Sequence, residues 1–521
     1  MKFIKQILTF SVKKIDSSIE KNSASIPPKE TLRKTLIDNI QKIQEALGDS
    51  KDLIIKKVRI GIRKKISISV LYIDGLSDTD AIQNFIIEPL MLEANNYKCA
   101  KAISLGKDIL DMLETSIFTV GDMTKINNFT DLYTYLLAGN TIILIDGYVQ
   151  GFKASTAGWE NRGIQEPSSQ VVVRGPKDGF SENLRTNTAM IRRRIKSPNL
   201  WLESILLGRE TQTNVSIMYM KGIVNDETVA EVKYRLKQID IDGILESAYI
   251  EELIQDKTWT PFPTIYNTER PDVISAGILE GRIAILVDGT PFALLVPAIF
   301  IQFIQSPEDY YQRYFFGIIR LLRILALILA LLSPSLYIAI TTFHQEMIPT
   351  TLLVSIAAQR EGIPFPAYIE ALMMEITFEL LREAGVRMPR AVGQAVSIVG
   401  ALVIGQAAVE AGLVSPVMVS VVAITAVASF TIPSFNLGIA IRMLRFCFML
   451  LAAGFGLFGI ILCIFILLLH LCSLRSFGIP YMAPMAPFHF SDQKDTVVRV
   501  PIKKMFSRPE FLNPQNKKRQ K

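Results

Sequence analysis

The sequence predicts two related α/β lobes, duplicated within a soluble N-terminal region, followed by an all-α polytopic membrane domain. Three observations lead to this prediction. Half of the 521 residues are hydrophobic, which is high for an average soluble protein. Charged and apolar residues are mixed as in a soluble fold as far as about Tyr311, whereas long apolar stretches dominate residues 315–474. Within the soluble region, one sequence pattern occurs twice.

These patterns divide the chain into successive parts. We expect a helical and basic N-terminal segment, a first lobe, a basic linker with helical content, a second lobe, a membrane domain and a basic C-terminal tail. Their expected ranges are 1–60, 61–150, 151–212, 213–310, 311–474 and 475–521, respectively. The membrane domain is expected to contain about four or five spans plus a re-entrant or interfacial segment.

The repeated pattern is L-x-G-x-x-x-I-L-[I/V]-D-G, found at residues 137–147 and 279–289, and residues 69–76 resemble residues 216–223 at nearly the same offset. Each copy is expected to begin with a strand, to continue in a helix (78–90 or 225–239) and to end in another strand. The pairs Asp146-Gly147 and Asp288-Gly289 close these final strands. Asp-Gly supplies the positive φ of a tight turn, so turns are predicted, with catalytic carboxylates as the alternative.

The segment between the lobes, residues 151–212, is rich in Gly, Pro, Ser and Arg. A basic linker is one interpretation. In the other, its arginines pair with carboxylates of a neighbouring subunit; these arginines are Arg174, Arg185, Arg192, Arg193 and Arg194.

Several classes of function are excluded by the pattern of residues. The formal net charge is +7, but the basic residues form no aromatic-interleaved platform, so no nucleic-acid partner is predicted. The basic tail is typical of segments attracted to anionic membrane lipid, with a solvated tail as the alternative. The three histidines are scattered and no phosphate-binding glycine loop is present. The sequence therefore predicts no metal, no cofactor and no enzymatic activity.

Apolar stretches of spanning length cover residues 318–343, 391–413, 415–435 and 444–471. Pro334 should kink the first of them, because proline removes an intrahelical hydrogen bond that neighbouring groups must replace. Residues 347–385 are interrupted by charges and prolines. The arginine flanks favour an even number of crossings, four in our preferred arrangement, with residues 347–385 re-entrant or lying on the surface.

Glu375, Glu379 and Glu383 recur every four residues and should share one face of a helix. They indicate either a solvated interfacial helix or a carboxylate-lined path that selects cations. In the second case, neutralising Glu375 or Glu379 is expected to leave assembly intact and to reduce the preference for cations.

The stretch 391–413 carries small residues at the same spacing, which allow close packing of helices. They are Gly393, Ser397, Ala401 and Gly405. Gln406 and Glu410 lie one turn apart on this helix and need a protein or water partner inside a membrane.

Residues 264–487 closely resemble the GerA-type A subunits of spore germinant receptors. The resemblance is densest in EGIPFPAYIEALMMEITFELLREAGVRMP (361–389), AVGQAVSIVGALVIGQAAVEAGLVSP (391–416) and HLCSLRSFGIPY (470–481). It implies a multi-pass subunit of the spore inner membrane that acts with a multi-span B-type nutrient-sensing subunit and a C-type lipoprotein. It also implies that A subunits form a homo-oligomer that conducts ions when nutrient binds.

Three hypotheses on function therefore remain. The first is a receptor subunit that forms a gated ion-conducting oligomer and so starts germination. The second is a secondary transporter, which the interrupted helices favour although no inverted repeat is visible in the sequence. The third is a membrane scaffold or a paralogous germination protein, whose soluble lobes recruit other proteins.

Overall fold

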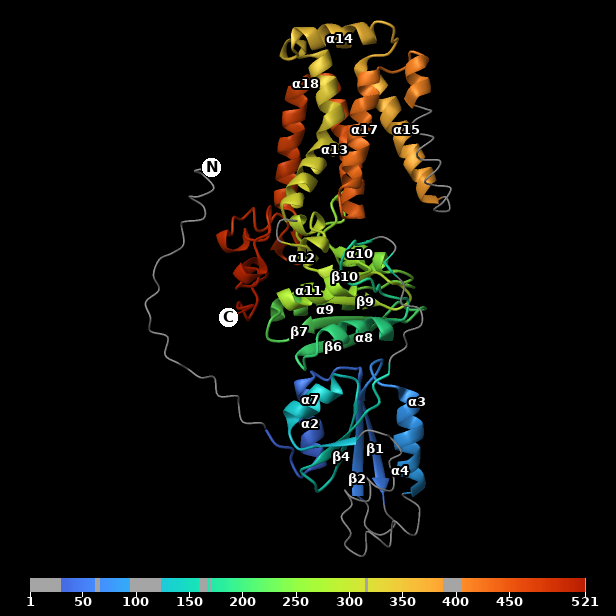
Figure 1. Cartoon of the computed structure of the whole chain (residues 1–521), viewed down its shortest axis with the longest axis vertical. Coiled ribbons are helices and arrows are strands. Elements are labelled where there is room, and N and C mark those ends of the chain that lie inside the picture. Colours follow the sequence, from blue (N-terminus) through green and yellow to red (C-terminus); the bar gives the residue numbers. More distant parts are fainter. Residues whose placement is uncertain are drawn as a thin grey trace, which may run out of the picture. The chain divides into compact units, whose positions relative to one another are not determined.

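The computed structural model of the chain describes residues 30–60, 66–93, 123–158, 166–167, 170–313, 317–387 and 405–520 (Figure 1). The chain forms two compact units. The first contains residues up to 41, 55–72 and 80–156, and the second contains residues 42–54, 73–79 and 157 onward. Two five-stranded sheets and a bundle of apolar helices are the main elements.

The first sheet has the strand order β1-β2-β4-β5-β3. Its strands are β1 (Leu53–Ile60), β2 (Ile66–Ile73), β3 (Met123–Ile126), β4 (Thr141–Ile145) and β5 (Gly151–Ala154). The accompanying helices are α2 (Leu36–Ala46), α3 (Thr79–Ile82), the π-helical turn η1 (Gln83–Ile87), α4 (Glu88–Glu93) and α7 (Phe129–Leu136). Every residue of β4 is buried, which explains why residues 142–145 (IILI) are continuously apolar rather than alternating.

The second sheet has the equivalent order β6-β7-β9-β10-β8. Its strands are β6 (Leu200–Leu207), β7 (Thr213–Met220), β8 (Tyr266–Thr268), β9 (Ile283–Val287) and β10 (Ala293–Val296). Its helices are α8 (Leu184–Arg194), α9 (Asp226–Lys237), α10 (Ser247–Ile254) and α11 (Pro271–Glu280). The side chains of Asn183 and Asn225 accept backbone hydrogen bonds at the starts of α8 and α9, which satisfies donors that a helix leaves free.

The Asp-Gly turns after β4 and β9 have matching geometry in the two lobes. Gly147 and Gly289 both have φ of 89°. Asp146 Oδ1 accepts a hydrogen bond from Leu36 N (3.0 Å), and Asp288 Oδ1 accepts one from Leu184 N (3.1 Å). Each carboxylate thus lies at the start of the first helix of its lobe, where free N–H groups and the helix dipole favour negative charge.

The lobes therefore extend further than the repeated pattern suggested. The first lobe, expected over residues 61–150, also contains α2 and β1, and the second, expected over 213–310, also contains α8 and β6. Residues 151–212, expected to be a basic linker, contain β5, α8 and β6. Three arginines in the last turn of α8 obscured its apolar side in the sequence, although Met190 and Ile191 are buried.

Several arginines of this segment pair with carboxylates of the same chain. Arg192 Nε lies 2.5 Å from Asp52 Oδ2, and both side chains are buried. Arg194 Nη2 lies 2.5 Å from Asp178 Oδ2. These two arginines therefore contribute to folding within one chain, whereas the alternative interpretation paired them with carboxylates of a neighbouring subunit.

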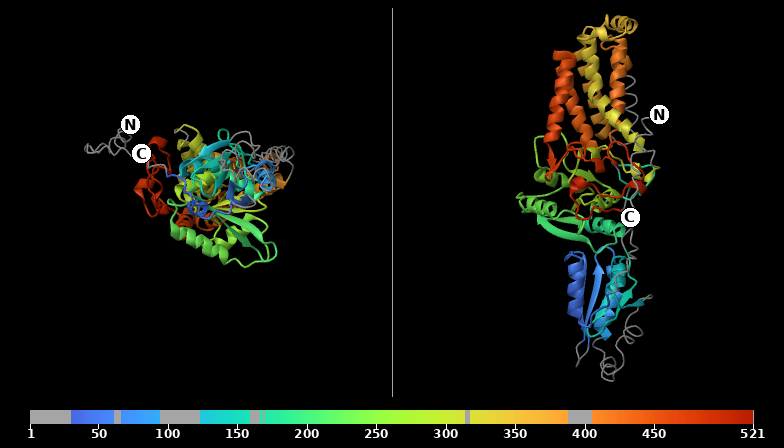
Figure 2. Two further views of the ribbon diagram at one scale, coloured as in Figure 1. Left: turned by 90° about the horizontal axis from the view of Figure 1, so that it is seen from below. Right: turned by 90° about the vertical axis from the view of Figure 1, so that its left-hand side faces the viewer.

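The helical region consists of α13 (Ile319–Thr342), α14 (Thr350–Arg360), α15 (Ala367–Arg387), a helical segment at 405–410, α17 (Pro416–Phe430) and α18 (Phe435–Ser473). Helices α13, α15, α17 and α18 pack against one another, while α14 caps one end of the bundle (Figure 2). Within the described residues, α13 and α18 are long and apolar enough to cross a membrane, with mean hydropathies of 2.3 and 2.8.

Helix α18 is a hairpin of two antiparallel arms, 435–455 and 457–473, because the chain reverses at Gly456 (φ 61°, ψ −139°). A Cβ atom on Gly459 would collide with the carbonyl oxygen of Leu451, although eight residues of a straight helix span about 12 Å. Both ends of α18 lie near the second lobe. His470 Nε2 is 2.9 Å from Thr260 Oγ1, while a Cβ atom on Gly456 would lie 2.8 Å from His344, beyond the far end of α13.

The C-terminal tail, residues 474–520, packs on the second lobe and on the start of α13 (Figure 1). It begins with the strand pair β11 (Arg475–Ser476) and β12 (Ile479–Pro480). Ser476 Oγ donates to Thr264 O (2.7 Å) and accepts from Ala298 N (3.0 Å). Arg508 Nε donates to Leu279 O (2.9 Å). Much of the tail is thus ordered against protein, which neither sequence-based interpretation included.

Candidate functional site: charged residues among the apolar helices

Charged side chains lie between the apolar helices and form a set that we call the charged seam. It consists of Arg360, Glu370, Glu375, Glu379, Arg382, Arg442 and Arg445. Four of these residues belong to α15, and the two last belong to the first arm of α18. Because isolated charges are expensive in an apolar environment, each needs a partner, and the pairs determine how α15 is held.

The most buried pair of the charged seam is Glu375 with Arg445. Arg445 Nη1 lies 2.6 Å from Glu375 Oε2, and the side chains are 2% and 3% exposed. Arg445 Nε also donates to Ala330 O at 2.6 Å. This carbonyl lies four residues before Pro334, which has no N–H to offer it. Pro334 thus leaves the carbonyl of Ala330 without its helical hydrogen bond, and Arg445 of α18 donates a hydrogen bond to this carbonyl instead.

Glu370, in the first turn of α15, joins this helix to the start of α17. Its Oε1 accepts hydrogen bonds from Ser415 N (2.6 Å) and from Ser415 Oγ. Ser415 is the N-cap of α17, so the carboxylate lies where the helix dipole favours a negative charge. Tyr337 OH of α13 lies 3.3 Å from Ser415 Oγ, and Arg360 Nε is 3.8 Å from Glu370 Oε2.

Glu379 is shared by two arginines near the second lobe. Arg442 Nη1 lies 2.7 Å from Glu379 Oε2, and Arg382 Nη1 lies 3.7 Å from Glu379 Oε1. Arg382 Nη2 also donates to Ser429 Oγ (2.6 Å), and its guanidinium carbon lies over the ring of Phe430, 4.7 Å from the ring centroid. One carboxylate therefore faces two guanidinium groups.

The structure separates the three glutamates that the sequence predicted to share a path. Glu375 and Glu379 point into the bundle and pair with α18, whereas Glu383 is 63% exposed and pairs with Arg387 on the same helix (2.6 Å). The four-residue spacing places them along α15, but their exposure rises toward its C-terminal end. Glu370 was missed by the sequence analysis, because it lies outside this spacing and its partner Ser415 is 45 residues away.

Of the four small residues expected to pack helices closely, Gly393, Ser397 and Ala401 lie outside the described residues. Gly405 faces α17, since a Cβ atom on it would lie 3.5 Å from Val419 Cγ1. Gln406 Nε2 donates to Glu410 Oε1 (2.9 Å), so these two polar residues bind each other on an exposed surface. Gln406 and Glu410 thus have a partner within one helical turn.

A second group of charges joins the start of α13 to the second lobe and the tail. Arg320 and Arg323 in the first turns of α13 are both buried. Arg320 binds Asp309 Oδ2 and Asp495 Oδ1, both at 3.1 Å, and Arg323 binds Asp309 Oδ1 at 2.9 Å. Burial raises the pKa of the Asp495 carboxyl, and the attraction of Arg320 only partly offsets this.

Two α/β lobes joined to apolar helices with internal ion pairs define a membrane-associated protein. Residues 41–511 match the family described as Bacillus/Clostridium GerA spore germination protein. The chain belongs to this family, which confirms the resemblance seen in the sequence and supports a role in spore germination.

Individual relatives cover nearly the whole chain. Spore germination protein KA of Bacillus subtilis (strain 168) is 50% identical over 487 residues, covering 93% of this chain and 88% of the relative. The uncharacterized membrane protein YfkQ of the same organism is 43% identical and covers 84% of each chain. A crystal structure of the N-terminal domain of the A subunit of the Bacillus megaterium spore germinant receptor GerK3 is 41% identical. It matches 53% of this chain and 99% of that domain, with a TM-score of 0.39.

Proposed function

We propose that this chain is the A subunit of a nutrient germinant receptor in the spore inner membrane, where several copies surround a gated ion path. Family membership supports the receptor role. The observation that carries the ion path is the arrangement of α15. Ion pairs fix one face of this helix to α18, while Ile376, Leu380, Glu383 and Arg387 form an exposed stripe along the adjacent face.

This stripe combines the two features that an ion path needs. Apolar rings such as Ile376 and Leu380 can close a pore by excluding water, and a ring of carboxylates such as Glu383 attracts cations. Glu375 and Glu379, which the sequence suggested for the same role, would then hold α15 in place rather than face the ions. The path is thus assigned to the exposed face of α15, and the packing to the neighbouring face that carries Glu375 and Glu379.

An even number of membrane crossings fits this proposal. Helix α13 leaves the second lobe, α15 returns to it, α17 returns to it again, and the two arms of α18 cross once each. Helix α15 ends on the lobe side and α17 begins on the far side, and the span predicted from the sequence at 391–413, most of which lies outside the described residues, would join them by one more crossing. With that predicted span, the proposed count is six rather than the preferred four, and it places the second lobe and the C-terminal tail on one side of the membrane. Labelling reporters on both termini should show the same sidedness; opposite sides would contradict this topology.

The proposed complex includes a B-type nutrient-sensing subunit and a C-type lipoprotein. Copurification from spore membranes should recover both partners together with more than one copy of this chain. Recovery of the chain without them would favour the second candidate, a membrane scaffold or paralogous germination protein, which the similarity to YfkQ supports.

Ion conductance in planar bilayers tests the proposed path. We expect Glu383→Gln to reduce the preference for cations over anions without loss of assembly, because the exposed Glu383–Arg387 pair contributes only about 0.2–1 kcal/mol to stability. Glu410→Gln is a matched control, since it neutralises an exposed carboxylate on another helix. Unchanged selectivity in Glu383→Gln would contradict the assignment of the path to the exposed stripe.

A further inference from the structure

A cavity of about 450 Å³ lies between the helical bundle and the second lobe. Its wall on the lobe side includes Tyr266 and residues 305–308, and its wall on the helix side includes residues 429–435 at the end of α17 and the start of α18. This volume is in the range of natural ligand sites. The cavity is therefore large enough for a small molecule or for the headgroup of a lipid.

Positive charge dominates the wall of this cavity. Arg323, Arg382 and Arg442 line it, and Glu308 is the carboxylate among the lining residues that the structure describes. The carboxylate of Glu308 binds the lobe side of the cavity, where its Oε1 accepts a hydrogen bond from Val173 N (2.8 Å). Arg323 is neutralised by Asp309. Excess charge remains at Arg382 and Arg442.

These two arginines share one carboxylate, Glu379, so one positive charge is left without a counter-charge among the described residues. Arg382 Nε is buried and has no hydrogen-bond acceptor there. Buried donors of this kind are normally satisfied, and an unpaired buried charge is unfavourable. An anion in the cavity would supply both the acceptor and the missing charge.

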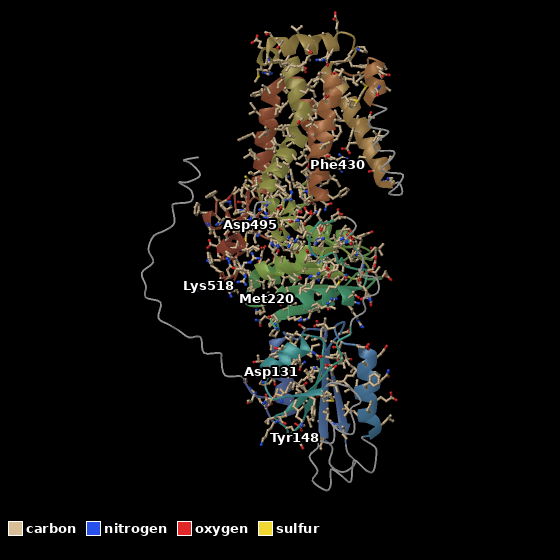
Figure 3. The ribbon with its side chains drawn as sticks, in the orientation of Figure 1. Asp131, Tyr148, Met220, Phe430, Asp495 and Lys518 are labelled. Carbon is tan, nitrogen blue, oxygen red and sulfur yellow. The ribbon has the colours of Figure 1, made fainter. Side chains whose placement is uncertain are left out.

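The rim of the cavity indicates where such an anion comes from. Phe430 and Phe435 line the cavity and are 71% and 67% exposed. Phe430 lies at the end of α17 that is nearer to the second lobe (Figure 3). Exposed aromatic residues at this position are typical of the boundary between lipid tails and headgroups. Guanidinium groups bind phosphate oxygens in a planar, two-pronged geometry, and basic pockets between membrane helices bind lipid headgroups.

We propose that this cavity binds the phosphate group of an anionic phospholipid, with Arg382 and Arg442 as its ligands. The lipid assignment rests on the proposed placement of the helices across a membrane. Ser429 and Phe430 position Arg382 through a hydrogen bond and a stacked ring. The bound lipid links α15, α17 and α18 to the second lobe, so its binding is coupled to their relative arrangement.

The test uses the purified full-length chain in nanodiscs that contain equal amounts of phosphatidylglycerol and phosphatidylcholine. After extraction into mild detergent, mass spectrometry measures the two lipids retained by each chain. We expect phosphatidylglycerol to be enriched over phosphatidylcholine. Arg382→Gln should reduce this enrichment by about ten-fold, because a charged hydrogen-bonding partner of the phosphate is removed.

Arg387→Gln is the matched control, because Arg387 lies on the same helix but outside the cavity lining and is 77% exposed. It should retain the enrichment. Arg382→Lys keeps the charge and the fold but loses the two-pronged geometry, so it should give an intermediate loss. Equal retention in Arg382→Gln, Arg382→Lys and Arg387→Gln would overturn the proposal.

Competition with inorganic phosphate separates the two sources of this chemistry. Lipid enrichment that persists in millimolar phosphate supports the phospholipid. If phosphate binds the chain but phosphatidylglycerol is retained no better than phosphatidylcholine, the lipid assignment is overturned. A chain that inserts and conducts ions without this enrichment contradicts only the present inference. A chain that fails to insert into nanodiscs contradicts the proposed membrane function.

Discussion

Glu375→Gln should destabilise the helical region, because Arg445 would keep its charge in a buried position. Arg445 is 3% exposed and lies 2.6 Å from Glu375. The sequence alone had predicted that neutralising Glu375 leaves assembly intact and changes only the preference for ions. The buried pair changes this expectation, since the glutamate is required for packing of α15 against α18.

The size of the effect follows from the burial of the pair. Removing one partner of a buried ion pair typically costs about 3–5 kcal/mol. We expect the lower end of this range, because Arg445 keeps its hydrogen bond to the carbonyl of Ala330. The exposed pair Glu383–Arg387 provides the comparison, and Glu383→Gln should cost at most about 1 kcal/mol.

The double variant Glu375→Gln with Arg445→Met tests whether the unpaired charge is the cause. Replacing both members of a buried pair with uncharged groups is often close to neutral, so the double variant should recover much of the lost stability. Thermal unfolding of the purified chain in detergent measures all variants. A melting temperature for Glu375→Gln equal to that of Glu383→Gln, or no recovery in the double variant, would refute the reasoning.

Three further predictions concern other parts of the chain. Gly147→Ala should lower the free energy of unfolding by about 1–2 kcal/mol, because φ is 89° there while no atom obstructs a Cβ; unchanged melting would argue against the turn. Burial raises the pKa of Glu251 from 4.5 to about 7, so the folded lobe holds a proton that the unfolded chain releases. The free energy of unfolding should therefore fall as pH rises from 4.5 to about 7, and Glu251→Gln should make the melting temperature less dependent on pH in this range. Gly456→Ala should destabilise the hairpin through both positive φ and contact with His344, whereas Gly454→Ala, which has open space, should be neutral or stabilising by about 1 kcal/mol. Equal melting of these last two variants would show that the reversal at Gly456 is not required.

The sequence predicted the two α/β lobes and the helical C-terminal region, because the relevant patterns are local. Alternating or continuous apolar residues indicate strands, and Asp-Gly indicates a turn with positive φ, which Gly147 and Gly289 have. What the pattern could not supply was the second role of Asp146 as an acceptor for Leu36 N. That hydrogen bond joins residues 110 positions apart and depends on the packing of α2 against the end of β4.

Only part of the charged seam could be predicted from the sequence. Three glutamates on one helix were visible, but a spacing of four residues says nothing about which residues face protein. Arg445 looked like a charge beside a membrane span, because its neighbours in the sequence are apolar. Its position becomes clear only when Pro334 is considered, since the free carbonyl of Ala330 lies on a different helix. Pro334 and Arg445, on separate apolar stretches, were the two signals in the sequence. Considered together, they could have predicted a hydrogen bond from the arginine to the carbonyl that the proline leaves free.

The number of crossings illustrates the same limit, and it decides on which side the tail lies. By hydropathy, residues 435–473 form one long apolar stretch. The chain reverses within this stretch at Gly456, and a glycine does not interrupt the apolar sequence as a polar loop would. Contacts at the end of the bundle nearer to the second lobe provide an independent argument. The tail residue Asp495 binds Arg320 at the start of α13 and Tyr310 beside the second lobe (Figure 3). A tail that pairs with the start of α13 lies at the same end of the bundle as that start, and this position supports the even number of crossings in the proposed topology.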